Sequence, residues 1–412
     1  MDQLHDRCCG IDVHQAELTA CVRLTEGKKN VTEHVQTFGT MTSDLLAVRD
    51  WLRAHRVTHV AMEATGVYWK CVYYALEDDF EVILVNAAHI KHVPGRKTDT
   101  IDAAWIAQLL AHGLLRASFV PPPPIRRLRD LTRYRKALTG ERTSEVNRIH
   151  KVLVDAGIKL ATVASSVMGV SGRAMMAALI EGSADPQALA DLARGRLRAK
   201  LPALREALAG HFDSHHAFLL ERMLAHVADL EADIEALSER IADELRPFER
   251  KVELLDTIPG VGRLSAEVIV AEIGIDMSQF PTPKHLASWA HLCPGQHESA
   301  GKRRSARVGK GPKWLRTNLI ECAQTASRGK GTYLSERYRQ LLRRRGHRKA
   351  IVALAHEILV VSWHVLSTDQ PYIDPGPDAA RKNSEAAIRN RAVRQLRALG
   401  YSVNLEHLQQ PA

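Results

Sequence analysis

Two stretches, Cys8-Cys9-Gly10-Ile11-Asp12-Val13 and Thr58-His59-Val60-Ala61-Met62-Glu63, decide how the first quarter of this chain folds. Each contains a short apolar run of the kind that forms buried strands, and each has an acidic residue at or near its end. Around them the pattern predicts strands at 17–24, 30–37 and 81–85, and helices at 43–55, 67–76 and 99–115, with Ser43 as the N-cap of the first helix. This part of the chain therefore reads as an α/β domain.

The predicted order is three strands, helix, strand, helix, strand, helix, which is that of a ribonuclease-H-like domain. In that architecture the first and fourth strands are neighbours, so we expect Asp12 and Glu63 to meet at the strand ends. Asp99 and Asp102 begin the last helix three positions apart, which places them on one face. Clustered carboxylates repel one another unless a cation lies between them, and oxygen ligands suit Mg²⁺. These acids predict a magnesium site, and two such ions can clamp a phosphodiester.

The composition favours a soluble protein with a polyanionic partner. The chain has 412 residues and a net charge of +10, which favours more than one domain and a nucleic-acid ligand. A merely basic protein is the alternative. None of the six cysteines forms a CxxC pair, so we expect no zinc site or disulfide framework and a reducing cytoplasm. We also expect no membrane span, since no apolar run looks long enough, and no secretion, since residues 1–6 contain no signal core.

The prolines at 121–124 mark a boundary, and a basic helix is predicted at 125–156. Its cations predict a surface that follows nucleic-acid phosphates; they are Arg126, Arg127, Arg129, Arg133, Arg135, Lys136, Arg142, Arg148 and Lys151. A solvated helix face is the alternative.

A heptad pattern predicts a second long helix. One seam position holds Leu220, Val227, Ile234 and Ile241, and the other holds Met223, Leu230 and Leu237. The pattern fits a coiled coil between two subunits, which we favour, but packing within one chain against the basic helix fits it equally well.

The segment Ile258-Pro259-Gly260-Val261-Gly262 lies between two predicted helices and resembles a helix–hairpin–helix turn. Such a turn exposes helix N-terminal amides that bind a phosphate without reading a base, and Gly260 and Gly262 would allow its close approach. A plain interhelical turn is the alternative.

A serine follows in Glu298-Ser299-Ala300-Gly301, and the next cations are Lys302, Arg303, Arg304, Arg307, Lys310, Lys313 and Arg316. A serine in a glycine-bearing loop is usually a turn residue. Cations that neutralise the nonbridging oxygens could instead let its hydroxyl attack phosphorus, once a base or metal accepts the proton. The covalent phosphoserine link would conserve the phosphodiester energy, which a recombinase needs and a nuclease does not.

Together these motifs resemble the DEDD transposases of the insertion-sequence one-hundred-and-ten type, including the insertion-sequence eleven-eleven group and the pilin-gene invertases. The resemblance extends over nearly the whole chain. It implies a RuvC-type ribonuclease-H fold with Asp12, Glu63, Asp99 and Asp102 as Mg²⁺ ligands, and Ser299 as the nucleophile of a C-terminal transposase domain. Many relatives have Ser-Gly-Gly where this chain has Ser299-Ala300-Gly301, and Ser305 is a weaker candidate.

The resemblance also implies donor and target DNA as substrates and a noncoding bridge RNA that base-pairs with both. It implies homodimers that assemble into tetramers, in which one subunit's carboxylates meet another's serine, and a bacterial cytoplasmic location at the nucleoid. The expected domains are 1–120 (RuvC-like catalytic), 121–250 (basic helix and coiled coil, for RNA binding and dimerisation), 251–375 (transposase domain) and 376–412 (basic tail). The alternatives are a metal-dependent junction-resolving nuclease with water as nucleophile, and a nucleic-acid-binding protein without catalysis.

Overall fold

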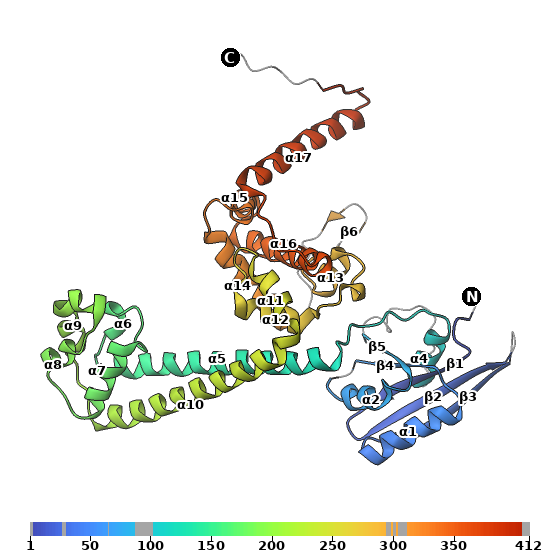
Figure 1. The fold of residues 1–412 in the computed structure, drawn as a ribbon, viewed down its shortest axis with the longest axis horizontal. Helices are drawn as coiled ribbons and strands as arrows, with labels where there is room; N and C mark the ends of the chain where they lie inside the picture. Colours follow the sequence, from blue (N-terminus) through green and yellow to red (C-terminus); the bar gives the residue numbers. More distant parts are fainter. Residues whose placement is uncertain are drawn as a thin grey trace. The chain divides into compact units, whose positions relative to one another are not determined.

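The structure is a computed structural model that describes residues 3–26, 30–64, 66–86, 102–293, 298–299, 302–303 and 311–405. At 298–299, 302–303 and 381–387 it describes the backbone alone. The chain divides into two compact units, Met1–Val120 and Pro121–Ala412 (Figure 1). Each unit has its own hydrophobic core.

The first unit is a five-stranded sheet in the order β3-β2-β1-β4-β5. Its elements are β1 (Arg7–Val13), β2 (Glu17–Glu26), β3 (Asn30–Gly39), α1 (Thr42–Ala54), β4 (His59–Glu63), α2 (Trp69–Leu76), β5 (Glu81–Val85) and α4 (Asp102–Ala111). The first three strands pair antiparallel, whereas β1 with β4 and β4 with β5 pair parallel. Apolar residues of α1 and α2 pack on one face and those of α4 on the other. The predicted order of elements is confirmed, and it is compatible with a ribonuclease-H-like domain.

Helix α1 starts earlier than the sequence pattern predicts. Its N-cap is Met41, so the prediction of Ser43 was wrong. The Asp44 carboxylate accepts a hydrogen bond from the Met41 amide at 3.1 Å. An acidic side chain three residues into the helix thus stabilises this end, in place of a serine hydroxyl.

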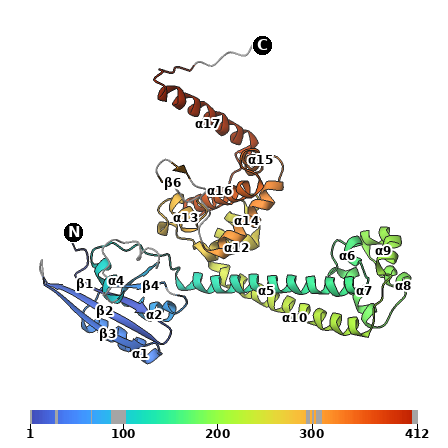
Figure 2. The same cartoon turned by 180° about the vertical axis from the view of Figure 1, so that it is seen from behind.

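The second unit is mostly helical in its described part. Its two longest helices, α5 (Pro123–Asp155) and α10 (Ser214–Leu245), lie side by side (Figures 1 and 2). Short helices join them: α6 (Leu160–Val163), α7 (Val170–Ile180), α8 (Pro186–Asp191), η1 (Gly195–Lys200) and α9 (Leu201–Leu208). The heptad residues Leu220 and Val227 share a buried core with Ile149 and Leu153 of α5. The first part of the α10 seam therefore packs within one chain, and a coiled coil between subunits is not confirmed.

The rest of the second unit contains the apolar helix α16 and the elements around it. Its elements are η2 (Arg246–Phe248), α11 (Glu249–Asp256), α12 (Arg263–Ile273), η3 (Met277–Gln279), α13 (Pro283–Trp289), β6 (Glu298–Ser299), β7 (Lys302–Arg303), α14 (Lys313–Arg328), α15 (Tyr333–Arg345), α16 (His347–Thr368) and α17 (Gly376–Ala398). By length and composition α16 could cross a membrane, so the expectation that no apolar run is long enough was wrong. Half of its apolar window is buried by neighbours that include α11, α13, α14 and α15, and a central core helix needs the same apolar composition.

Candidate active site

Asp12 and Glu63 lie at the ends of neighbouring strands. Ile11 of β1 pairs with Met62 of β4 in parallel register, so each acidic residue stands one position beyond this pair. Adjacent strands are about 4.8 Å apart. Side chains alternate along a strand, and Gly10 and Ala61, two positions earlier, lie on the face that α4 covers. The strand pairing predicted from the sequence is confirmed, and it brings two carboxylates to one edge of one face.

Helix α4 crosses β1 at Gly10. A Cβ on Gly10 would overlap the Ala103 carbonyl oxygen and the Ala107 amide nitrogen, so glycine is the residue that allows this approach. Asp102 immediately precedes Ala103, and the first turn of α4 therefore begins beside the strand that carries Asp12. Asp99 lies outside the described residues.

Among the described residues, Asp12 has a histidine and two cysteines near it. The Nε2 of His14 lies 3.3 Å from an Asp12 carboxylate oxygen, and the Asp12 side chain is 22% exposed. Cys8 precedes it on the same face, and Cys21 lies across the strand from Gly10. Burial raises the pKa of the Cys8 thiol to about 11 and that of Cys21 to about 12. Both thiols are therefore neutral at physiological pH and add no charge to the acidic edge.

The carboxylate oxygens are ligands of the kind that a hard divalent cation prefers. Glu63 is partly buried, whereas Asp102 is exposed at the start of α4. Within the described ranges, no three His, Cys, Asp or Glu side chains lie close enough together to hold a metal ion. The described residues therefore supply the carboxylate pair of Asp12 and Glu63, and Asp102 at the start of α4. A magnesium site formed by these three residues and Asp99 stays a prediction.

Ser299 lies in a two-residue strand, β6. β6 and β7 pair antiparallel, which places Ser299 directly opposite Lys302 and Glu298 opposite Arg303. The backbone therefore brings two of the predicted cations alongside the serine strand. Arg304, Ser305, Arg307 and Lys310 lie outside the described residues.

The two glycines of the predicted phosphate-binding turn differ in their surroundings. Gly260 has a φ of +89°, and a Cβ there would lie 2.7 Å from the Ala326 amide nitrogen of α14. Gly262 is the N-cap of α12, and a Cβ there would meet nothing within 4 Å. Packing against α14 accounts for Gly260, whereas Gly262 leaves space before the helix N-terminus. A helix–hairpin–helix that binds phosphate stays a prediction.

Several cations of α5 form ion pairs inside the second unit. Arg133 donates to both carboxylate oxygens of Glu272 at 2.7 and 2.9 Å. Arg129 donates to the main-chain oxygens of Ala271 and Glu272 at 3.1 and 2.6 Å. The Glu272 side chain is only 1% exposed, so its charge depends on these partners.

The pairing continues along α5. Arg135 pairs with Glu267 at 2.7 Å in a buried contact, and Lys136 pairs with Glu321 at 2.9 Å on the surface. These contacts give the basic helix a structural role that the sequence did not indicate, because they hold α5 to α12 and α14. Arg127 is exposed and Arg126 is partly buried. Phosphate binding by this helix stays a prediction.

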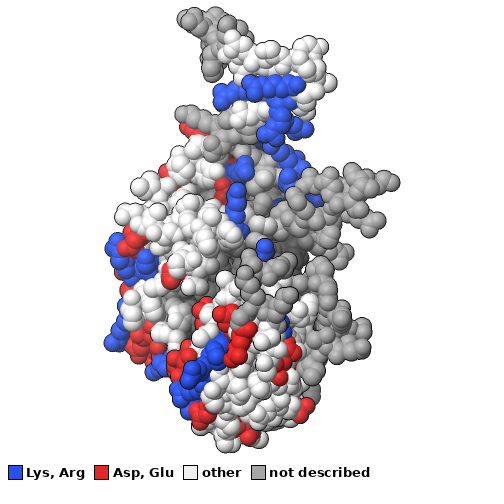
Figure 3. Space-filling view, turned by 90° about the vertical axis from the view of Figure 1, so that its right-hand side faces the viewer, with Lys and Arg blue, Asp and Glu red and all other residues white. Residues whose placement is uncertain are grey.

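A group of surface cations was not among the predicted site residues; we call it the basic corner and define it as Arg343, Arg344, Arg345, Arg348 and Lys349. These residues lie where α15 ends and α16 begins, all are exposed, and none makes an ion pair with another described residue. Figure 3 shows that Lys and Arg predominate over Asp and Glu near the C-terminal end of this unit. Five cations in seven residues with no acid among them were the signal that could have identified it.

Two family models match the chain. Residues 9–158 match one described as Transposase, and residues 252–339 match one described as Transposase IS116/IS110/IS902 family. The first match contains all four candidate carboxylates, and the second contains Gly260, Gly262 and Ser299.

Curated relatives agree with these matches. The chain is 27% identical over 326 residues to the transposase for insertion sequence element IS1111A of Coxiella burnetii, an alignment that covers 77% of this chain and 80% of that protein. It is 24% identical over 378 residues to the pilin gene-inverting protein of Moraxella bovis, covering 88% of this chain and 96% of the relative. A 43.6 kDa protein of insertion element IS110 from Streptomyces coelicolor is 29% identical over 311 residues, covering 66% and 71%. The chain belongs to the IS110 family of transposases.

Proposed function

We propose that this transposase is an RNA-guided DNA recombinase that excises and inserts an insertion sequence. The observation that carries the proposal is the carboxylate pair at the ends of β1 and β4, in a chain whose two parts match transposase models. A covered sheet face with an acidic edge is suited to phosphoryl transfer, because hard cations held there stabilise charge on phosphate oxygens.

In the proposed reaction the hydroxyl of Ser299 attacks the scissile phosphorus. The Oγ–P bond forms while the bond from phosphorus to one deoxyribose oxygen breaks, and the serine proton is transferred so that the released strand ends in a hydroxyl. Bound Mg²⁺, held by Asp12, Glu63, Asp99 and Asp102, would neutralise the developing negative charge. A hydroxyl from another strand then attacks the phosphoserine and releases the serine, so strands are rejoined without an external energy source.

The proposal includes a bridge RNA that pairs with donor and target DNA, and dimers that assemble into tetramers in the bacterial cytoplasm. The similarity to the transposase of Coxiella burnetii supports an insertion sequence as the DNA substrate, and the exposed basic corner supports a nucleic-acid ligand. Sequencing the RNA that co-purifies with the protein tests the guide. A discrete species encoded beside the transposase gene would support it, and only random cellular RNA would contradict it.

The nucleophile is tested by trapping the DNA reaction in denaturant and looking for protein attached to DNA. We expect Ser299→Ala to abolish the adduct and recombination, and Ser305→Ala, the matched control in the same segment, to retain both. An adduct that survives Ser299→Ala would remove Ser299 from the mechanism.

A junction-resolving nuclease is the second candidate, because the carboxylate edge alone could activate water. It predicts cleaved DNA with no protein attached, in the same trapping experiment. A binding protein without catalysis predicts that Asp12→Asn and Glu63→Gln leave function in cells unchanged.

A further inference from the structure

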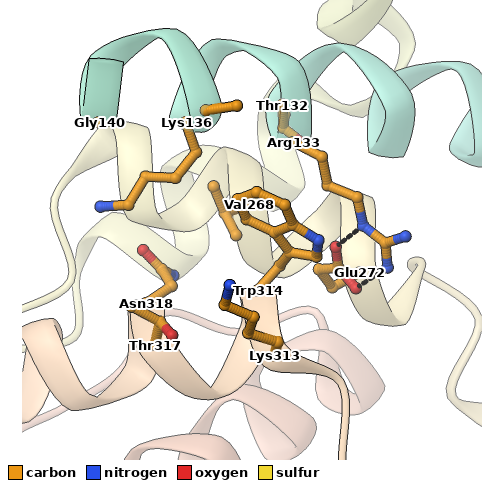
Figure 4. Close-up of a pocket in the computed structure, with 11 residues that line it drawn as sticks. Thr132, Arg133, Lys136, Gly140, Val268, Glu272, Lys313, Trp314, Thr317 and Asn318 are labelled. Atoms are coloured by element: carbon orange, nitrogen blue, oxygen red, sulfur yellow. Dashed lines mark hydrogen bonds and ion pairs between the residues drawn. The ribbon is translucent and has the colours of Figure 1, made fainter. Parts of the chain in front are cut away.

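A pocket of about 250 Å³ lies in the second unit where α5, α12 and α14 meet (Figure 4). Ligand pockets usually measure about 300–1,000 Å³, so this pocket is small and suits a single planar ring system. None of the glycine-turn or hairpin residues lines it. The pocket is therefore separate from the glycine turn and from Ser299, and a ligand in it would not be explained by the proposed reaction.

One wall of the pocket is an aromatic ring with a cation beside it. Trp314 stands in the centre of Figure 4, between α14 and α5. Lys313 Nζ lies 5.8 Å from the centroid of the Trp314 ring. Lys313 is exposed and makes no ion pair with the described residues, so its charge is available to a phosphate at the pocket mouth.

The opposite wall contains a glycine that packing does not require. Gly140 lies inside the long helix α5, and a Cβ there would meet nothing within 4 Å. Glycine inside a helix is destabilising relative to alanine. Gly140 shares a helix face with Arg133 and Lys136, which also line the pocket, so the missing side chain keeps that wall open.

The polar groups of the lining can recognise an edge of a heterocycle. Asn318 is 7% exposed, and its side-chain nitrogen donates to the Ser265 carbonyl oxygen at 3.1 Å. This bond fixes the amide orientation, since a carbonyl oxygen can only accept, and it leaves the Asn318 oxygen as an acceptor. The acidic lining residue, Glu272, is neutralised by Arg133 and therefore does not repel a polyanion.

We propose that this pocket receives one unpaired nucleobase of a nucleic-acid strand, stacked on Trp314 with its backbone near Lys313. Stacking on an aromatic ring tolerates any base, whereas a base inside a duplex cannot enter. The proposal rests on the proposed function only in taking nucleic acid as the ligand. The proposal assigns no catalytic step to the pocket. Base binding in the pocket could therefore be disproved while recombination through Ser299 is confirmed, and recombination through Ser299 could be disproved while base binding is confirmed.

The test fills the pocket without removing a contact. Gly140→Phe would occupy the space, and Gly140→Ala is the matched control, which adds one methyl group. Binding of the full-length protein to fluorescent single-stranded DNA, single-stranded RNA and fully paired duplex DNA of equal length is measured by anisotropy. We expect Gly140→Phe to weaken single-strand binding about tenfold, with duplex binding and the Gly140→Ala variant unchanged. The strand that loses more affinity identifies DNA or RNA as the source of the base.

A second pair of variants distinguishes the loss of base stacking from misfolding. Trp314→Phe retains a stacking ring and should retain most single-strand affinity, whereas Trp314→Ala should lose as much as Gly140→Phe. Circular dichroism and thermal unfolding establish that the variants are folded. Unchanged single-strand binding by folded Gly140→Phe would overturn the proposal, as would equal losses for single strands and duplex. A change in oligomeric state with unchanged nucleic-acid binding would also overturn it, because it would assign the pocket to a side chain from a second copy.

Discussion

Asp12 and Glu63, which are 51 positions apart in the sequence, each stand one residue beyond the Ile11–Met62 pair of two parallel strands. Parallel strands end at the same edge of a sheet, so the register alone places both carboxylates at one edge. Both also lie on the face that α4 covers. The position of the two carboxylates at this edge therefore follows from the register of β1 and β4 and does not depend on any single side-chain hydrogen bond.

Removing either charge should stop DNA strand exchange and leave the fold intact. We expect Asp12→Asn and Glu63→Gln each to lower the rate more than about 100-fold, since these residues would be metal ligands rather than their supports. Asp78→Asn, an exposed acid in the turn before β5, is the control and should react normally. Strand exchange at saturating Mg²⁺ measures the effect, and a normal rate for both variants would contradict an active site at this edge.

The close crossing of α4 over β1 makes Gly10 sensitive to the smallest substitution. Gly10→Ala should displace α4 and the attached Asp102, because the methyl group overlaps the main chain at Ala103 and Ala107. We expect a lower melting temperature and lost activity. Gly140→Ala, in open space within a helix, should instead raise stability by about 0.5–1 kcal/mol. Equal thermal stability of Gly10→Ala and the parent protein would show that the sheet and helix do not pack this closely.

The buried Glu272, which pairs with Arg133 of α5, should contribute far more to stability than the exposed Glu321, which pairs with Lys136 of the same helix. Glu272→Gln leaves Arg133 and Arg129 without their carboxylate and should cost about 3 kcal/mol. Glu321→Gln breaks the exposed pair with Lys136 and should cost less than about 1 kcal/mol. Chemical denaturation compares the two, and similar losses would mean that the Glu272 cluster is solvated.

Substitutions of the two glycines of the 258–262 turn should have different effects, one on protein stability and the other on DNA binding. Gly260→Ala combines a positive φ with a collision against α14 and should destabilise the second unit. Gly262→Ala should fold normally, yet lower duplex affinity if the α12 N-terminus holds a phosphate. Thermal unfolding and duplex titration are the readouts. Unchanged affinity for Gly262→Ala would leave the segment as a plain interhelical turn.

The basic corner should contribute to the salt dependence of nucleic-acid binding. If Arg344 and Arg345 each neutralise one phosphate, replacing both with glutamine should reduce the log–log salt slope for duplex DNA by about 1.8. Arg240→Gln is the control, because Arg240 is exposed but paired with Glu244 on α10. Titrations at several salt concentrations give the slope. A slope that both substitutions leave unchanged would exclude the corner from the DNA contact.

The sequence alone determined the elements of the first unit and their acidic ends. Alternating and periodic apolar residues indicate burial from the local sequence. The strands carrying Asp12 and Glu63 and the long basic helix could therefore be predicted from short windows. The order of those elements then indicated that β1 and β4 are neighbours, because few sheet topologies use it.

Only the tertiary structure decided which partner each polar or small residue meets. The sequence predicts a phosphate-binding surface that includes Arg129, Arg133 and Arg135. In the structure these arginines form ion pairs with Glu272 and Glu267, which are more than 130 positions away. Likewise, Met41 rather than Ser43 caps α1, the α10 seam packs on α5, and Gly140 opens a pocket beside Trp314. Periodicity shows that a face is buried, but it carries no information on what covers that face; charge pairing and close packing act between segments that meet only when the chain folds.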